Sequence, residues 1–245
     1  MIQFFAPDIK STATLPQDES AHCVRVLRHR AGDEIHVIDG EGSRLLCRIL
    51  DPNPRGVMVE IISSEIIPPS WDVNIILAVA PTKNMDRMEW LTEKAVEIGI
   101  NRIVPIICTH SERKVLKTER LQKIAVSAMK QSLKTFLPRI DEPTPILSFI
   151  KEITLEEPGK SAMKFMGYCD KEYPLRRLIQ EYKPGKNVVI MIGPEGDFSP
   201  EEVKKSVDAG FIPVTFGDNR LRTETAALVG IDMIHFINAT ANINK

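Results

Sequence analysis

Short apolar runs alternate with helical segments from Trp71 to the end of the chain, and this alternation restricts the fold more than any other feature of the sequence. The predicted strands are residues 73–79, 102–108, 163–168, 188–192 and 211–216. Strands that alternate with helices form a parallel sheet that is covered by helices on both faces. Ligands of such sheets bind beyond the carboxyl ends of the strands, so the loops at those ends are candidate sites.

The helices between these strands are predicted from apolar residues at helical spacing. Met88, Leu91 and Ala95 define one helix, and Asp86 with Glu89 can form a capping box at its start. Further helices are predicted around residues 121–129, 175–181, 200–209 and 227–234. The segment at residues 141–160 is rich in proline and acidic residues, and we expect it to be an exposed loop.

The first 70 residues have a different pattern. Four short strands are predicted at residues 2–5, 34–39, 43–50 and 57–64, with one helix at residues 18–27. Turns that contain glycine or proline separate the strands. Pro68 and Pro69 indicate a linker, because proline cannot continue a strand ladder. We therefore predict a small β-rich domain at residues 1–70, expected to be a barrel, and an α/β domain at residues 71–245.

The composition is that of an ordinary soluble globular protein, with 43% hydrophobic and 27% charged residues among 245. The net charge of -1 provides no global attraction to nucleic acid or to membranes. No apolar stretch approaches the length of a membrane span, and the N-terminus lacks the layout of a secretory signal. The four cysteines form no CxxC pair, so we expect reduced thiols, no metal site and a cytoplasmic location.

Basic residues gather in one segment although the whole chain is nearly neutral. Between Arg113 and Arg139 there are eight basic residues and a single acidic one, Glu119. Such an excess of one sign repels itself unless it meets an anion, and a polyphosphate backbone is the commonest partner. A smaller basic group follows the first predicted helix: Arg25, Arg28, His29 and Arg30. The pattern favours a nucleic-acid surface, and a basic surface without a ligand is the alternative.

Two glycine-containing turns each follow a predicted strand and precede a predicted helix. The first is Gly193-Pro194-Glu195-Gly196, and the second starts at Gly217. Glycine lets the backbone approach a ligand closely, and the amides of the following helix can hold an anion. One such turn is more simply explained without a ligand, but two turns at neighbouring strand ends form a pocket. The sequence lacks GxGxxG and GxxxxGK[ST], which disfavours a Rossmann dinucleotide site and a P-loop and leaves a pocket for a small nucleoside-like ligand.

Several stretches occur in an order and spacing that match one known family along nearly the whole chain. They read KNMDRMEWLTEKAVEIGINRIVP, THSERK, KQSLKTFLPRI, IGPEGDFSPEE and FGDNRLRTETAAL, with HCVRVLRHRAGDEI in the first domain. The chain resembles the RsmE family, the 16S ribosomal RNA uridine-N3 methyltransferases of the SPOUT superfamily. It departs from the family pattern at Asp197 and Leu133, where glycine is common. Asn219 and Arg220 also stand where the family more often has arginine and then a branched apolar residue.

The resemblance implies an N-terminal PUA-like β-barrel and a trefoil-knotted SPOUT α/β domain with a parallel sheet. It implies S-adenosylmethionine as methyl donor without a metal, and a homodimer with the final helix in its interface. It also implies 16S ribosomal RNA as substrate, in the assembled small ribosomal subunit. The cofactor-binding residues that it implies are Ile192, Gly193, Pro194, Glu195, Gly196, Phe216, Gly217, Leu221, Arg222 and Thr223.

Arg222 and Glu224 are the candidate catalytic residues. Methylation of a uridine N3 requires loss of its proton and stabilisation of the charge that develops on O2 and O4, for which arginine is well suited. The alternative for Arg222 is a structural ion pair with Glu224 or with a partner subunit. Glu224 is the weaker candidate for a base, because the first turn of a helix favours the charged carboxylate. Capping the helix or orienting Arg222 is the favoured role of Glu224.

Phosphate contacts are expected from Arg113 and Lys114. Gln131 and Ser132 have the groups to contact a flipped base or the cofactor, or are ordinary polar residues of a helix. The predicted RNA-binding residues are Arg25, Arg28, Arg30, Lys83, Arg113, Lys114, Gln131 and Ser132. Two other functions stay open, because a fold does not fix a substrate: a SPOUT methyltransferase that acts on transfer RNA, and a non-catalytic RNA-binding protein with a degenerate pocket.

Overall fold

The structure is a computed structural model that describes residues 2–169, 173–174 and 176–243. Contacts divide the chain into two compact units. The first unit is Met1–Ser70 with Ala125–Leu137, and the second is Trp71–Ile124 with Pro138–Lys245. The boundary at Ser70 follows the two prolines that predict a linker. The assignment of Ala125–Leu137 to the first unit has no counterpart in the sequence pattern.

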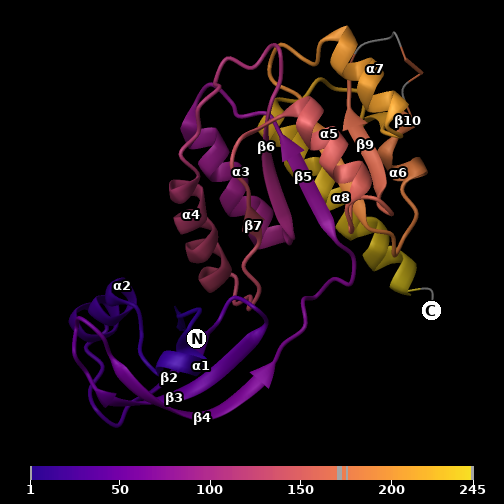
Figure 1. The fold of residues 1–245 in the computed structure, drawn as a ribbon. Helices are drawn as coiled ribbons and strands as arrows, with labels where there is room; N and C mark the ends of the chain where they lie inside the picture. The colour runs from indigo at the N-terminus through magenta and orange to yellow at the C-terminus, as the bar shows by residue number, and fades with distance from the viewer. Residues whose placement is uncertain (1, 170–172, 175, 244–245) are drawn as a thin grey trace. The chain divides into compact units, whose positions relative to one another are not determined.

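The first unit contains a small four-stranded sheet in the order β1-β2-β3-β4 (Figure 1). The strands are β1 Gln3–Phe5, β2 Glu34–Ile38, β3 Ser43–Asp51 and β4 Met58–Ile66. β1 runs parallel to β2, whereas β3 is antiparallel to both β2 and β4. Alternate residues of β3, among them Leu45 and Ile49, enter an apolar core with Phe4 and Val37, as the period of two in a strand requires. The small β-rich domain is therefore confirmed, as a sheet with β1 and β4 at its edges.

Short helices accompany this sheet. α1 is Ile9–Thr12, and the helix predicted at residues 18–27 is observed as α2 Gln17–Ala21 followed by a π-helical turn, η1, at His22–Val26. After α1, Thr14 forms an isolated antiparallel bridge with Met58 of β4. Cys23 of η1 is fully buried, and its packing against the sheet explains why this amphipathic segment stays helical.

The second unit contains, within the described residues, an eight-stranded sheet in which every pairing is parallel. The order is β10-β12-β9-β11-β5-β6-β7, with β8 paired to β6. The strands are β5 Ile75–Val79, β6 Arg102–Ile107, β7 Arg139–Ile140, β8 Thr144–Pro145, β9 Met163–Gly167, β10 Arg176–Arg177, β11 Val188–Ile192 and β12 Ile212–Thr215. The predicted parallel sheet is confirmed. β5 and β11 are buried on both faces, which is why their sequences are uninterrupted apolar runs.

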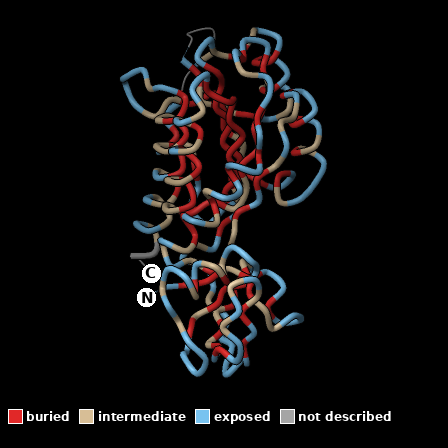
Figure 2. Tube along the Cα trace, turned by 90° about the vertical axis from the view of Figure 1, so that its left-hand side faces the viewer, coloured by how far each residue is buried: buried red, intermediate tan, exposed pale blue. Residues whose placement is uncertain are grey.

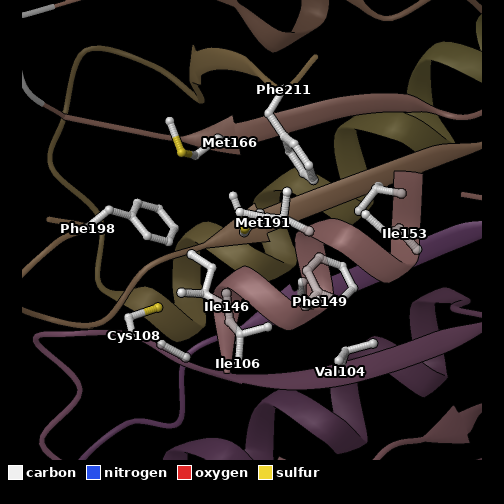
Figure 3. Close-up of a cluster of buried hydrophobic side chains, with 14 of the residues drawn as sticks. Val104, Ile106, Cys108, Ile146, Phe149, Ile153, Met166, Met191, Phe198 and Phe211 are labelled. Carbon is white, nitrogen blue, oxygen red and sulfur yellow. The ribbon is translucent and has the colours of Figure 1, made fainter. Parts of the chain in front are cut away.

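The helices associated with this sheet cover both of its faces (Figure 1). They are α3 Met85–Ile98, α5 Ile146–Leu155, α6 Leu178–Glu181, α7 Pro200–Asp208 and α8 Thr223–Ile243. A further helix, α4 Thr118–Gln131, has its residues from Ala125 onward assigned to the first unit. On one face, α5 and α7 share an apolar cluster with β5, β6, β9 and β11 (Figure 3). α8 packs on β5 and β11 from the other side. Figure 2 shows that buried residues lie in the interior of this unit, with exposed residues around them. Residue 175, where one predicted helix starts, lies outside the described residues.

Two predictions from the sequence are wrong. Residues 141–160 are not an exposed loop, because they contain β8 and α5, whose residues Ile146, Phe149, Ile150 and Ile153 are buried. This i, i+3, i+4, i+7 pattern is the signal of a buried helix face, and the surrounding prolines and acidic residues obscured it. α3 does not start with a capping box of Asp86 and Glu89. Asn84 is its N-cap, and the Asn84 side chain accepts a hydrogen bond from the Asp86 N–H.

No helix in the described part of the chain is both long enough and apolar enough to cross a membrane.

Candidate functional site

A cavity of about 400 Å³ lies at the carboxyl ends of β9, β11 and β12 in the second unit. This is the edge where ligands of parallel sheets bind. The lining residues are Gly167, Tyr168, Cys169, Ile192, Gly193, Pro194, Glu195, Asp197, Val214, Thr215, Phe216, Asn219, Arg220, Leu221, Arg222, Thr223 and Ala226. The two glycine turns that the sequence singled out therefore meet around one cavity.

Most of the residues predicted to bind a cofactor line this cavity. They are Ile192, Gly193, Pro194, Glu195, Phe216, Leu221, Arg222 and Thr223. Gly196 and Gly217 are not among the lining residues. A Cβ atom at Gly196 would lie 3.0 Å from the Cβ of His110, so this glycine permits a close approach of two loops. Gly217 has a φ of 151° with open space around it, so its backbone conformation is what favours glycine there.

Thr223 joins the two glycine turns. It is the first residue of α8, and its buried hydroxyl donates a 3.1 Å hydrogen bond to the carbonyl oxygen of Gly193. The bond links the loop after β11 to the loop after β12. Both walls of the cavity are thereby held in one arrangement by a side chain that also lines it.

The loop after β11 is a tight turn with an unusual residue at its end. The Asp197 N–H donates to the carbonyl of Pro194 at 2.9 Å, and Asp197 has a φ of 63°. The Asp197 carboxylate accepts a hydrogen bond from the N–H of Phe198. α7 then starts with a capping box, in which Ser199 and Glu202 satisfy each other's backbone N–H groups.

The third wall of the cavity was not predicted from the sequence, and it consists of Gly167 at the end of β9 with Tyr168 and Cys169 after it. A signal was present, because this strand was predicted and carboxyl ends of parallel strands meet at one edge. A Cβ atom at Gly167 would lie 2.8 Å from side-chain carbons of both Ile192 and Phe216. Any larger residue at this position would require the side chains of Ile192 and Phe216 to shift.

The two candidate catalytic residues have different environments. Arg222 is exposed at the cavity, and within the described ranges no side chain pairs with its guanidinium. Glu224 is buried, and its Oε1 lies 3.6 Å from Nε of Arg87 on α3. Its Oε2 has no hydrogen-bond partner among the described residues. In this structure α8 directs the Glu224 carboxylate toward Arg87. The favoured role of Glu224, to cap the helix or to orient Arg222, stays a prediction.

Three of the predicted RNA-binding residues come together in the second unit. Lys83, Arg113 and Lys114 line a shallow hollow. The Arg113 guanidinium donates to the carbonyls of Thr82 and Lys83, with the shortest bond at 2.7 Å. Lys83 pairs with Glu112 at 2.9 Å, and this hydrogen bond raises the pKa of the Lys83 ammonium. Only Lys114 of the three is exposed without a side-chain partner among the described residues.

The remaining predicted RNA-binding residues belong to the first unit. Arg25, Arg28 and Arg30 are exposed, as is Gln131 at the end of α4. The Ser132 hydroxyl, just after α4, donates to the backbone carbonyl of Ala128 in the last turns of that helix.

The basic segment between Arg113 and Arg139 is partly neutralised. Three of its members form ion pairs with acidic residues from elsewhere in the chain: Arg120 with Glu89, Lys130 with Glu19, and Arg139 with Asp141. The unpaired positive charge of this segment is therefore smaller than the sequence suggested. In the second unit, Lys114, Lys117 and Lys123 are exposed and form no ion pair among the described residues.

No group of three or more histidine, cysteine or acidic side chains in the described part of the chain has a geometry that could hold a metal ion. Cys23, Cys47 and Cys108 are buried free thiols, and Cys169 is exposed.

Family models match most of the chain. An RNA methyltransferase domain matches residues 69–235, and an RNA methyltransferase PUA domain matches residues 15–62. Among curated relatives, the chain is 27% identical over 221 residues to ribosomal RNA small subunit methyltransferase E of Buchnera aphidicola. The match covers 87% of this chain and 84% of that protein.

Solved structures show the same fold over nearly the full length. A probable rRNA-methyltransferase from Porphyromonas gingivalis is 42% identical, with a TM-score of 0.90, and the match covers 98% of this chain and 100% of that one. A ribosomal RNA small subunit methyltransferase E from Neisseria gonorrhoeae, bound to S-adenosyl methionine, is 26% identical with a TM-score of 0.82. That match covers 97% of this chain and 98% of the other.

Proposed function

Since the chain belongs to the RsmE family of RNA methyltransferases, we propose that it transfers a methyl group from S-adenosylmethionine to N3 of a uridine in 16S ribosomal RNA. The observation that carries the proposal is the cavity at the carboxyl ends of β9, β11 and β12, with Arg222 exposed at it. The cavity lies at the sheet edge where the family motifs IGPEG and RLRTETA are located. The similar protein from Neisseria gonorrhoeae, which is bound to S-adenosyl methionine, supports the choice of cofactor.

The cavity suits S-adenosylmethionine in size and in chemistry. Its volume of about 400 Å³ falls in the range typical of small-molecule sites, roughly 300–1,000 Å³. Ile192, Val214 and Leu221 provide apolar walls for an adenine ring. The backbone of the two glycine turns provides hydrogen-bonding groups close to the ligand. When bound, the cofactor supplies an electrophilic methyl group on a sulfonium.

Arg222 is proposed to stabilise the uridine as it loses its N3 proton. The two carbonyls beside N3 make it a poor nucleophile while it is protonated, and negative charge develops on O2 and O4 when the proton leaves. A guanidinium with no partner among the described side chains is available to meet that charge. Glu224 is not proposed as the base, because its carboxylate is buried next to Arg87 and does not line the cavity. Its proposed role is to fix the start of α8, from which Arg222 and Thr223 reach the cavity.

The proposed setting of the reaction is the assembled small ribosomal subunit in the cytoplasm. The exposed basic residues Arg25, Arg28 and Arg30 and the hollow around Lys114 support contacts with RNA phosphates. A homodimer is also part of the proposal. It rests on the family resemblance, which places the final helix in the interface. The trefoil knot stays a prediction from the family resemblance.

The test uses small ribosomal subunits from cells that lack this protein. They are incubated with purified protein and labelled S-adenosylmethionine, and the RNA is digested to nucleosides. Labelled 3-methyluridine in 16S RNA is the expected result. Label in transfer RNA alone would replace the proposed substrate, and cofactor binding without label in any RNA would leave a non-catalytic RNA-binding protein as the better account.

A further inference from the structure

His110 contacts the loop after β11 without lining the cavity. Its Nδ1 lies 3.1 Å from the carbonyl oxygen of Gly196 and 3.0 Å from that of Asp197. Both carbonyls accept hydrogen bonds only, so Nδ1 must carry a proton and share it between them. The contact therefore fixes the ring in the form that is protonated at Nδ1.

Thr109 makes a second link to the same segment. Its N–H and its hydroxyl both donate to Oε1 of Glu202, at 2.7 and 3.0 Å. Glu202 is buried in the first turn of α7, where it closes the capping box with Ser199. Two adjacent residues after β6 thus hold the beginning and the end of residues 196–202.

This segment contains a backbone conformation that requires support. Asp197 has a φ of 63°, in the left-handed region that glycine adopts easily and other residues adopt at a cost. Conformations of this kind persist where the surrounding structure over-determines them. Two hydrogen bonds supply the restraint here. The Asp197 N–H donates to the carbonyl of Pro194, and Nδ1 of His110 donates to the carbonyl of Asp197. Gly196 allows the ring to approach, because a Cβ atom there would lie 3.0 Å from the Cβ of His110.

We propose that His110 is a positioning residue for the cofactor. It acts through the carbonyls of Gly196 and Asp197, and it holds the loop in the conformation in which Gly193, Pro194, Glu195 and Asp197 line the cavity. This inference rests on the proposed function, because the ligand it concerns is S-adenosylmethionine. It goes beyond that function by assigning a role to a residue outside the cavity.

Two substitutions that match each other in shape separate the hydrogen bond from the packing of the side chain. In His110→Asn the amide NH₂ can donate from near the position of Nδ1, whereas in His110→Asp a carboxylate presents only acceptors to two carbonyls. Binding of S-adenosylmethionine to the purified full-length protein is measured by titration calorimetry. We expect affinity to fall about tenfold in His110→Ala, further in His110→Asp, and no more than about threefold in His110→Asn. His22→Ala, which removes an exposed histidine of the first unit, serves as the matched control and leaves affinity unchanged.

A second measurement needs no ligand. Nitrogen chemical shifts of the neutral His110 ring, recorded on labelled wild-type protein, report which nitrogen carries the proton. We expect the Nδ1-protonated tautomer. The Nε2-protonated tautomer would overturn the inference, as would wild-type affinity in both His110→Ala and His110→Asp. In those cases the wild-type protein still binds S-adenosylmethionine, whereas failure of the wild type to bind would overturn the proposed function together with this inference.

Discussion

At the scale of single residues, Leu133 adopts a left-handed conformation with a φ of 56°, two residues after the end of α4. The Lys134 N–H donates to the carbonyl of Met129, and the Leu133 N–H donates to that of Lys130. These two bonds form a Schellman motif with Leu133 at the position that glycine usually occupies. Leucine at this position departs from the family pattern, and the structure gives the physical reason why glycine is common there.

Replacing Leu133 by glycine is expected to stabilise the protein. Removing the Cβ atom relieves about 1–2 kcal/mol of left-handed strain, and the greater freedom of glycine in the unfolded chain offsets about half of it. We expect a net gain of about 0.5–1 kcal/mol, measured by urea denaturation. The control is Leu155→Gly, at an exposed leucine that ends α5, where the same change lowers stability by up to about 1 kcal/mol. A loss of stability in Leu133→Gly would contradict the strain argument.

Arg222 offers a second prediction at this scale. If its guanidinium stabilises charge on the uridine, Arg222→Ala should lower kcat by about 10²–10³-fold. The affinity for S-adenosylmethionine should change much less. Arg222→Lys should recover only part of the rate, because an ammonium lacks the planar fork of donors. Methyl transfer to small subunits measures kcat, and Arg55→Ala, at an exposed turn between β3 and β4, is the control. A uniform rise in KM with unchanged kcat would show that Arg222 only binds RNA.

At the scale of elements, α5 is predicted to be a main support of the sheet. Phe149 is completely buried in the cluster that α5 shares with the strands, whereas Leu147 on the same helix is 39% exposed. Phe149→Ala should therefore lower the free energy of unfolding by about 3–5 kcal/mol. Leu147→Ala should lower it by less than about 1 kcal/mol. Urea denaturation of both variants tests this, and equal effects would mean that α5 is not anchored through Phe149.

The same elements show what the sequence could and could not predict. β5 and β11 were predictable, because strands that are buried on both faces leave continuous apolar runs. α5 was not predicted, because prolines and acidic residues flank it in the sequence, although its apolar residues occur at helical spacing. The contact between His110 and Gly196 could not be predicted, because it joins residues 86 positions apart through a single ring nitrogen and a backbone carbonyl. Local pattern thus locates the glycine turns, and only tertiary structure reveals what holds them.

At the scale of the whole molecule, Asp39 is expected to contribute to the acid sensitivity of the protein. Burial acts to raise the pKa of Asp39, but hydrogen bonds from Lys10 and from the N–H groups of Glu41 and Ser43 outweigh it and lower the pKa to about 2. A carboxyl group with a lowered folded pKa stabilises the protein above its unfolded pKa of about 3.9, and this stabilisation is lost as the pH falls toward 2. The unfolding free energy of the wild type should therefore fall more steeply from pH 4 to pH 2 than that of Asp39→Asn, as measured by far-UV circular dichroism in urea. Parallel curves would show that other carboxyl groups dominate.

The affinity for RNA cannot come from the overall charge, because the chain carries a net charge of -1 and has a pI near 6.5. It must depend on local groups that no acidic side chain neutralises. In the second unit, Lys114, Lys117 and Lys123 are exposed and without ion-pair partners among the described residues. If all three contact phosphates, changing them together to glutamine should reduce the slope of log affinity against log salt by about 2.

The matched control changes the same number of exposed lysines in the same unit, Lys151, Lys183 and Lys186, to glutamine. Both triple variants alter the net charge equally, so a global electrostatic effect would change both slopes alike. Binding to a 16S RNA fragment is measured between about 50 and 200 mM salt, because log affinity over this range falls in proportion to the number of phosphate contacts. A reduced slope in the first variant alone assigns the RNA surface to the region of Lys114 and α4. Equal slopes would contradict that assignment, and the basic residues of the first unit would then have to supply the contacts.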